Sequence, residues 1–329
     1  MPFDIRQFNK RVLLTGAGFS RNWGGRLARE MWEEIFSHPA VQLRPALRML
    51  LVRTPLFEDA LTEIRGPKYR DEDQAAMNSA IREAFERMDA EHVAQLPSQK
   101  IDDRAIREFL GRFYSVDHRV GYIFSLNQDA LIELLAGLWA DLLPGFSLPG
   151  IRLLPPLPMP AAGRPRFAYP ATPDMSEIGL EGNLNYIKLH ASFLWHPEDG
   201  SPGMVLGGGK EIEIGRSPLL TWYYQLFNQV LCSGDVRLLV IGYSFKDEHI
   251  NRIIWTAAQS FGARIFIWDT THSLELVEKV GIADRAFPTR CVDLRPFLCG
   301  AASRPLVEVF PCGAHPTPEW KRIAASFFS

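Results

Sequence analysis

The feature that most constrains the fold is an apolar strand that runs directly into a glycine-rich turn near the start of the chain. Arg11–Thr15 (RVLLT) has the composition of a buried strand in a parallel sheet, and Gly16–Gly18 (GAG) interrupts it before a helical run begins. Glycine lets a backbone approach a pyrophosphate closely, and N–H groups at a helix N-terminus meet its charge. The spacing is not the full G-x-G-x-x-G dinucleotide fingerprint. Taken alone, the stretch fits both a nucleotide site and a plain strand-to-helix turn.

Composition excludes several classes of protein. The 329 residues can bury one large core, and a net charge of -2 gives no overall bias towards nucleic acid or an anionic membrane. No apolar run reaches the length of a transmembrane helix, and the first ten residues lack the apolar core of a signal peptide. We therefore expect a cytoplasmic protein with no membrane contact and no direct nucleic-acid binding. The cysteines form no C-x-x-C pair, so we expect reduced thiols and no zinc; they are Cys232, Cys291, Cys299 and Cys312.

Strands alternate with helices along most of the chain, which predicts an α/β fold with a Rossmann-like doubly wound parallel sheet. We treat residues 1–329 as a single domain. The expected strands are Arg11–Thr15, Tyr122–Leu126, Tyr186–Leu189, Arg237–Ile241 and Arg264–Trp268. The expected helices include Ala130–Trp139, Pro218–Leu231, Asp247–Gln259 and a C-terminal helix from Pro318.

Four further segments interrupt or extend this alternation. Helical periodicity dominates a predicted insertion over about residues 27–118, between the first two strands, whereas about residues 143–173 are rich in proline and predict an irregular surface loop. Met204–Ile214 predicts a hairpin that turns at Gly207–Gly209, and Leu306–Phe310 predicts one more strand.

Polar residues follow several of the expected strands. Asn127 and Asp129 come after the second strand, His190 after the third, and Gly242 and Ser244 after the fourth. In a doubly wound sheet, ligands bind beyond the carboxyl ends of the strands, so these positions converge on one edge. Each also has a structural interpretation, because Asn and Asp are favoured helix caps and a lone histidine is often a core residue.

Together, these segments resemble the sirtuin-like family. Gly16–Ser20 matches its GAG-[IF]-S phosphate loop, and Ser125–Gly137 (SLNQDALIELLAG) resembles its T-Q-N-x-D…A-G segment. KLHAS resembles the segment that carries the family's catalytic histidine, which falls on His190. VIGYSFKDEHIN resembles the G-[TYF]-S segment in the form found in bacterial antiphage-defence members.

The resemblance implies a function and a set of site residues. Members of the defence branch hydrolyse NAD+, so we expect an NAD+ glycohydrolase that releases nicotinamide and ADP-ribose. Asn127 would orient the attacking water or a ribose hydroxyl, His190 would act as general base, and Asp129 would hold the nicotinamide carboxamide. The residues expected to bind the dinucleotide are Gly16, Ala17, Gly18, Phe19, Ser20, Gly242, Ser244 and, at the end of a later strand, Asp269.

Departures from the family pattern bear on the alternatives. Asn22–Arg26 stands where sirtuin deacylases carry P-D-F-R, and the four-cysteine zinc module is absent. Both argue against the first alternative, a protein deacylase or ADP-ribosyltransferase. The second alternative is a non-catalytic subunit that binds NAD or ADP-ribose. The defence branch also implies a homo-oligomer or a partner, such as a HerA-type ATPase or an Argonaute-like protein.

Overall fold

The computed structural model of the protein describes residues 8–96, 100–136, 143, 145–154, 166–169, 174, 177–197, 204–270 and 293–329. For residues 153, 154, 166, 167 and 169 it describes the backbone alone.

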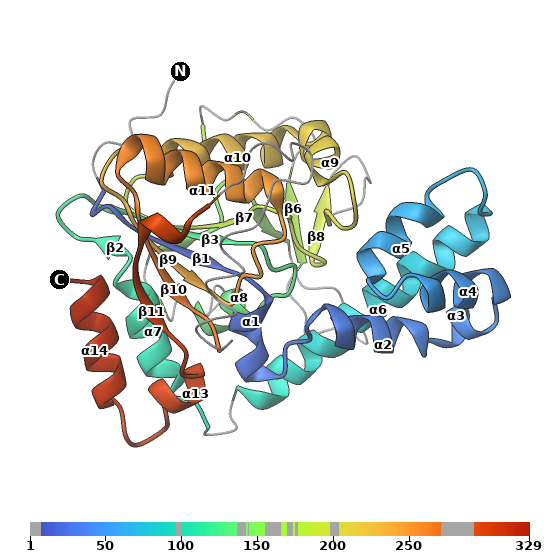
Figure 1. The fold of residues 1–329 in the computed structure, drawn as a ribbon, viewed down its shortest axis with the longest axis horizontal. Helices are drawn as coiled ribbons and strands as arrows, with labels where there is room; N and C mark the ends of the chain where they lie inside the picture. The colour runs from blue at the N-terminus through green and yellow to red at the C-terminus, as the bar shows by residue number, and fades with distance from the viewer. Residues whose placement is uncertain are drawn as a thin grey trace.

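A parallel sheet forms the centre of the molecule, in the strand order β11-β10-β9-β1-β3-β7-β4 (Figure 1). Its members are β1 (Arg11–Thr15), β3 (Val120–Ser125), β4 (Phe146–Ser147), β7 (Leu184–Lys188), β9 (Arg237–Ile241), β10 (Arg264–Trp268) and β11 (Leu298–Ala302). In the described part of this sheet, β2 (Tyr114–Ser115) is added at the side of β3 as an antiparallel strand. The central strands are buried along almost their whole length, as their continuous apolar runs require. The predicted doubly wound fold is confirmed.

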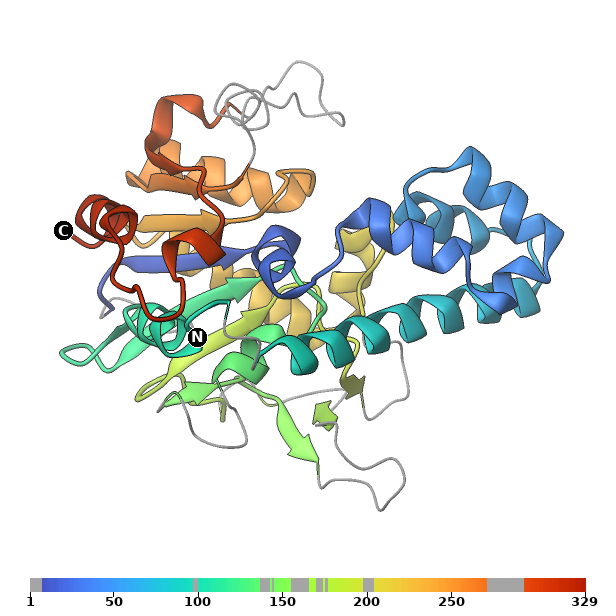
Figure 2. The same ribbon diagram turned by 90° about the horizontal axis from the view of Figure 1, so that it is seen from below.

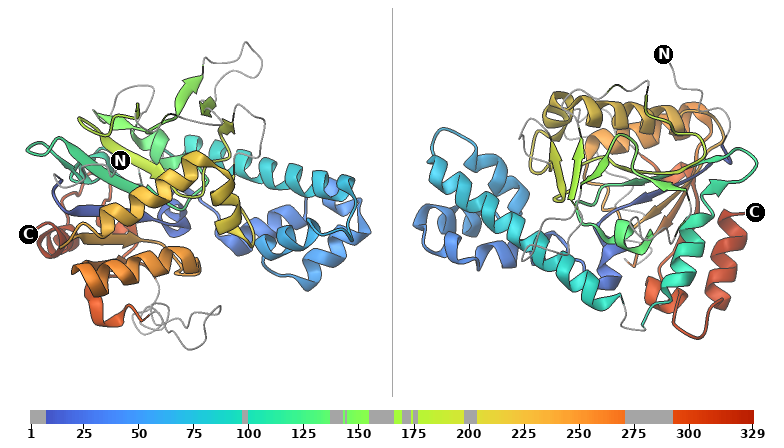
Figure 3. Two further views of the ribbon diagram at one scale, coloured as in Figure 1. Left: turned by 90° about the horizontal axis from the view of Figure 1, so that it is seen from above. Right: turned by 180° about the vertical axis from the view of Figure 1, so that it is seen from behind.

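Helices cover both faces of the sheet (Figures 1 and 3). α10 (Pro218–Leu231) and α11 (Glu248–Phe261) lie on one face, whereas α7 (Asp103–Gly111), α8 (Leu131–Ala136) and α14 (Pro318–Phe327) lie on the other. Two of these helices begin with a side-chain cap followed by proline: the Ser217 hydroxyl accepts from Leu220 N, and the Thr317 hydroxyl accepts from Trp320 N.

A helical insertion projects from one side of the sheet (Figure 2). It contains α2 (Ala28–Phe36), α3 (Pro39–Gln42), α4 (Pro45–Arg53), α5 (Phe57–Ile64) and the long α6 (Asp71–Gln95). The predicted range of 27–118 also takes in α7, which packs against the main sheet, and β2, which pairs with β3. On α7, Phe109 packs edge-on against Trp268 of β10 and Trp320 of α14, so aromatic contacts join this helix to the main core.

The proline-rich segment is more regular than expected. Its described parts include β4, β5 (Arg152–Leu154) and β6 (Arg166–Tyr169), and β5 and β6 join β8 (Trp195–Pro197) in a small three-stranded sheet. The prediction of an irregular loop is therefore wrong for these residues. The rest of 143–173 lies largely outside the described residues.

Two other local predictions are also wrong. Met204–Ile214 is no hairpin, because Lys210–Arg216 forms helix α9 and Met204 makes only an isolated bridge with Ala191. Leu306–Val309 is the short helix α13, which buries Leu306 and Val309 on one side, and the strand that completes this edge of the sheet is β11. None of the helices in the described ranges is long and apolar enough to cross a bilayer. Two short 3-10 turns also lie in the described chain, η1 (Arg21–Trp23) and η2 (Arg295–Phe297).

Candidate active site

The glycine turn after β1 lies at the topological switch point of the sheet. The chain leaves β1 towards β3 on one side, whereas it leaves the adjacent β9 towards β10 on the other. A crevice for a ligand is expected between two such strand ends. The turn leads into α1 (Ala17–Ser20), with Gly16 at its N-cap position.

Three glycines let the two loops at this point touch backbone to backbone. A Cβ on Gly16 would lie 2.6 Å from the Gly242 carbonyl oxygen, and one on Gly18 would lie 2.7 Å from Gly242 Cα. Gly242 itself has φ of +64°, which only glycine adopts without strain, and its own Cβ would lie 2.5 Å from Gly18 Cα. Glycine is thus required at these positions for packing, before any ligand is considered.

Two of the N–H groups expected to face a pyrophosphate have protein partners. Gly16 N donates to Ile241 O and Gly18 N donates to Gly242 O, both at 2.9 Å. Ala17, between them, is exposed at the start of α1. Any contact with a dinucleotide at this turn therefore falls chiefly on Ala17 and the N-terminus of α1.

A buried hydrogen-bond network joins the turn to the end of β3. Asn127 Nδ2 donates to both Gly16 O and Ser20 Oγ at 3.0 Å, and Ser20 Oγ donates to Asp129 Oδ2 at 2.8 Å. Asp129 Oδ1 also accepts from Leu131 N at 3.0 Å, so it caps α8 as the structural interpretation anticipated. Ser20, Asn127 and Asp129 therefore lie together as predicted, but most of their hydrogen bonds are made to other protein atoms rather than left open for a ligand.

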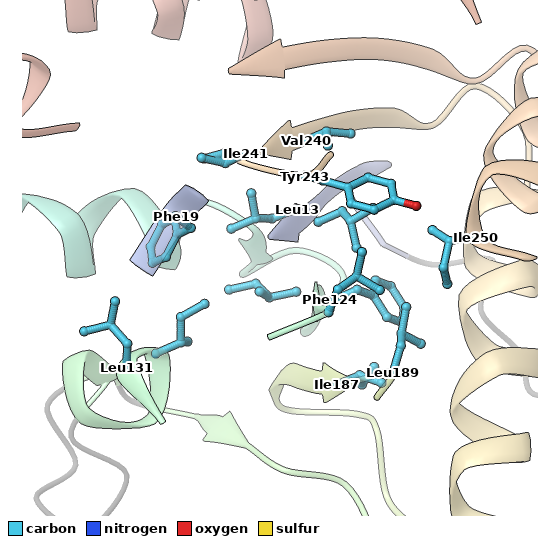
Figure 4. Packing of buried hydrophobic residues seen from close by; sticks show 14 of the residues in the cluster. Leu13, Phe19, Phe124, Leu131, Ile187, Leu189, Val240, Ile241, Tyr243 and Ile250 are labelled. Atoms are coloured by element: carbon cyan, nitrogen blue, oxygen red, sulfur yellow. The ribbon is translucent and has the colours of Figure 1, made fainter. Parts of the chain in front are cut away.

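Phe19 turns away from this network into the core. Its side chain is fully buried, and its ring packs against Trp23 with centroids 5.5 Å apart. Figure 4 shows the ring among apolar side chains, on the side of the sheet where Leu131 of α8 lies. Phe19 supports the loop from beneath, which differs from the direct cofactor contact expected for it.

His190 lies against a second histidine, His249, in the first turn of α11. The Nε2 atoms of His190 and His249 are 3.3 Å apart, and both rings are buried. Burial lowers the pKa of His190 to about 3, although Asp247 acts in the opposite direction. Burial also lowers the pKa of His249. His190 is therefore a neutral imidazole at physiological pH. With this lowered pKa it is a weaker base than a histidine with the near-neutral pKa that the sequence led us to expect.

Hydrogen bonds fix the turn between β9 and α11, the helix that carries His249. Tyr243 Oη donates to Asn251 Oδ1 at 3.0 Å, and Asn251 Nδ2 donates to Phe245 O at 2.7 Å. Asp247, at the N-cap position of α11, accepts from Lys210 Nζ at 2.8 Å. Burial alone would raise the pKa of Asp247, but His190 and Lys210 lower it, so the group is a carboxylate.

Two further buried groups lie beside Asp129. His92, from α6, is fully buried, and neither ring nitrogen has a hydrogen-bond partner within the described part of the chain. Burial lowers its pKa, whereas Asp129 raises it. Lys188 at the end of β7 donates to the Asp129 carbonyl and pairs with Glu133 Oε1 at 2.8 Å, with both side chains fully buried. The sequence does not predict either residue as part of the site. His92 lies on a helix of the insertion, and Lys188 is the last residue of β7, within the strand itself.

The remaining predicted positions lie along the same edge of the sheet. Ser244 is exposed beyond β9, and Asp269 is half-buried beyond β10, where its N–H donates to Ala302 O. In the order of the strands, Asp269 is two strands away from the glycine turn. Among the described residues, no group of three or more His, Cys, Asp or Glu side chains is arranged to hold a metal ion. Cys291 lies outside those residues.

Fold and site together define a doubly wound α/β protein with a glycine turn at its switch point and a pair of buried histidines beyond β7 and β9. No protein-family model and no curated protein matches the sequence. Two solved structures are similar over most of the chain. A Sir2 homologue in complex with NAD has a TM-score of 0.42 and 15% identity, covering 93% of this chain and 88% of that one. A mutant Sir2 homologue in complex with ADP-ribose has a TM-score of 0.39 and 13% identity, covering 93% and 90%. Because both TM-scores are below 0.5, the residues of the site themselves have to indicate the function.

Proposed function

We propose that this protein is an NAD+ glycohydrolase that releases nicotinamide and ADP-ribose. The observation that supports the proposal most is the buried Ser20–Asn127–Asp129 network, which ties the glycine turn of β1 to the end of β3. It places an amide and a carboxylate next to the switch point of the sheet, with the neutral His190 at the end of β7. These are the groups that the resemblance to sirtuins assigns to NAD+ chemistry.

The reaction requires few protein groups. The bond from the ribose C1′ to the nicotinamide nitrogen breaks, and its electron pair leaves with the neutral nicotinamide ring. A water oxygen forms the new bond to C1′, and His190 accepts the proton that this water loses. The transition state is cationic at C1′, so the Asp129 carboxylate would stabilise it, and fixed positions supply most of the rate. Asp247 would stabilise the protonated form of His190, since its charge raises the pKa of that ring.

A second candidate is a non-catalytic NAD-binding subunit. It is favoured by one observation, namely that Asn127 Nδ2 and both Asp129 oxygens already bond to protein atoms. Side chains used in this way can shape a binding site without attacking a substrate. The two candidates differ in whether nicotinamide is released.

The role in the cell extends the proposal. An enzyme that depletes NAD+ harms its host unless its activity is controlled, so we propose an antiphage effector that is switched on by assembly. The partner would be a HerA-type ATPase, an Argonaute-like protein or further copies of this chain.

The test is incubation of the purified protein with NAD+, alone and with each candidate partner, followed by chromatography of the products. We expect equimolar nicotinamide and ADP-ribose from the wild type, and loss of both products in Asn127→Ala and His190→Ala. Binding of NAD+ without release of nicotinamide under every condition would favour the non-catalytic subunit. An acetylated-peptide arm that releases deacetylated product would instead indicate a deacylase.

A further inference from the structure

An ion-pair chain connects the helical insertion to the two histidines. Lys210 Nζ at the start of α9 lies 2.8 Å from Asp247 Oδ1 and 3.0 Å from Glu58 Oε2. Glu58 belongs to the first turn of α5, in the insertion, whereas Asp247 begins α11, which carries His249. One lysine thus bridges two parts of the molecule that are far apart in sequence.

The segment that carries Lys210 contacts both the helical insertion and the loop that follows β7. Val205 N donates to His190 O at 3.1 Å, so the segment lies against the loop of the catalytic histidine. A few residues later, Gly208 N donates to Thr62 Oγ1 of α5. Gly207 has no room for a side chain, because a Cβ there would lie 2.8 Å from the same hydroxyl oxygen. Residues 205–210 are therefore held between α5 and the His190 loop.

The charges along the chain act on both imidazoles. The titratable and charged groups that face them are Asp247, Lys210, Glu211 and Arg252, in addition to each other. Two acidic neighbours keep Lys210 protonated, since Asp247 and Glu58 raise its pKa against the effect of burial. Glu58 is about one-third exposed, so the Glu58–Lys210 pair adds little to overall stability. The pair instead fixes the position of the Lys210 ammonium group between Glu58 and Asp247.

We propose that Glu58 and Lys210 are positioning residues, through which the helical insertion holds Asp247 and His249 in place against His190. The inference rests on the proposed NAD+ glycohydrolase activity, and it names the route by which that activity responds to the insertion. A partner that moves α5 would then alter the active site without touching it.

The experiment uses the full chain with Glu58→Gln, Lys210→Met and the double variant. Glu63→Gln is the matched control, since it makes the same change on the same helix but its partner, Arg53, lies within the insertion. With NAD+, under the assembly condition in which the wild type turns over, we expect Glu58→Gln to lower kcat about 3–10-fold with KM within twofold. This is less than the roughly 10²-fold loss that a 1 Å misplacement can cause, because Glu58 acts on His190 only through Lys210 and Asp247. The double variant should be no worse than Lys210→Met alone, because the two residues act in series.

A second measurement does not depend on turnover. In protein labelled with 15N-histidine, the ring resonances of His190 and His249 are titrated by NMR and assigned with His190→Gln and His249→Gln. We expect Lys210→Met to raise the pKa of His249, Glu58→Gln to shift the same ring, and Glu63→Gln to leave it unchanged. Unaltered ring resonances in both Glu58→Gln and Lys210→Met would overturn the inference, as would a kcat of Glu58→Gln equal to that of Glu63→Gln. If the ring resonances shift in Glu58→Gln and Lys210→Met but the wild type never releases nicotinamide, the glycohydrolase is refuted and the coupling between the insertion and the histidines stands.

Discussion

The ring nitrogens of His190 and His249 lie 3.3 Å apart, although the strands that precede them are not neighbours. His190 follows β7 and His249 follows β9, and both β1 and β3 lie between those two strands. The pair therefore spans the edge of the sheet directly beyond the switch point. That arrangement leads to the first prediction.

Replacing His190 by glutamine should lower kcat for NAD+ hydrolysis by about 10²-fold, the lower end of the range for a general base, because its lowered pKa makes it a weak base. The Kd for NAD+, measured by calorimetry, should change less than threefold, because glutamine keeps much of the volume and polarity. His196→Gln, a histidine on β8 outside the pair, is the control and should retain turnover. Equal turnover in wild type and His190→Gln would rule out the base assignment.

Stability should depend on pH through His190. Its pKa is about 3 in the folded protein, against about 6.5 when unfolded. Between these values the unfolded state binds more protons, so stability rises with pH and is lost as pH falls from about 6.5 towards 3. Each pH unit in this window contributes at most about 1.4 kcal/mol. Urea unfolding at pH 7.0, 5.5 and 4.5 should give a smaller loss for His190→Gln than for wild type; parallel losses would contradict the assignment.

Gly242→Ala should both destabilise the protein and weaken NAD+ binding. The new methyl group would collide with the backbone of Gly18, where nothing can give way cheaply, so we expect a cost of about 2–4 kcal/mol. Gly234→Ala is the matched control, because Gly234 also has positive φ but no atom lies within 4 Å of the place that its methyl group would take. In thermal unfolding, Gly242→Ala should have a lower melting temperature than Gly234→Ala, because only Gly242→Ala adds a collision to the backbone strain. Similar melting temperatures in the two variants would show that the loops do not need close contact.

Ser20→Ala should leave Asp129 Oδ2 without its buried donor, at a cost of about 1–3 kcal/mol. Ser79→Ala, which removes an exposed hydroxyl on α6, should stay within about 0.5 kcal/mol of wild type. If urea denaturation gives the same small change for both, the network does not bear on stability.

Lys188→Met should be more damaging, because it strands the buried Glu133 carboxyl, whose pKa burial already raises. Removing one partner of a buried pair typically costs about 3–5 kcal/mol, whereas removing both with apolar residues can be nearly neutral. We therefore expect Lys188→Met/Glu133→Leu to recover a large part of the loss in urea denaturation. A double variant as unstable as the sum of the singles would argue that the two side chains do not act as a pair.

The main sheet was predictable because its strands are apolar throughout. β1, β9 and β10 have the bounds that their sequences predict, and the helices α10 and α11 follow from helical periodicity. The failures are local, and α9 illustrates how one of them arises. The alternation of Glu and Ile in α9 and the glycines before it favour a hairpin. In the tertiary structure, Gly208 bonds to Thr62 and Lys210 bonds to Asp247, and these contacts accompany a helix instead.

For the site, the sequence indicated which strand ends carry polar groups, and the network of Ser20, Asn127 and Asp129 does lie together. It did not indicate how those groups bond to one another. The pairing of His190 with His249 depends on the order of the strands, which no local pattern contains. The position of His92 depends on how α6 returns to the sheet. The hydrogen bonds from Gly16 N and Gly18 N to the end of β9 and the loop after it also depend on the order of the strands.

The length of α6 has a mechanical consequence. Its 25 residues span about 37 Å at the rise of an α-helix, from the outer end of the insertion to the side of Asp129. The same helix carries Asp71 in its first turn and the buried His92 in its last turn, so a displacement of its outer end as a rigid body would also move His92. The distant tip of the insertion and the interior of the site are, in this sense, two ends of one rod.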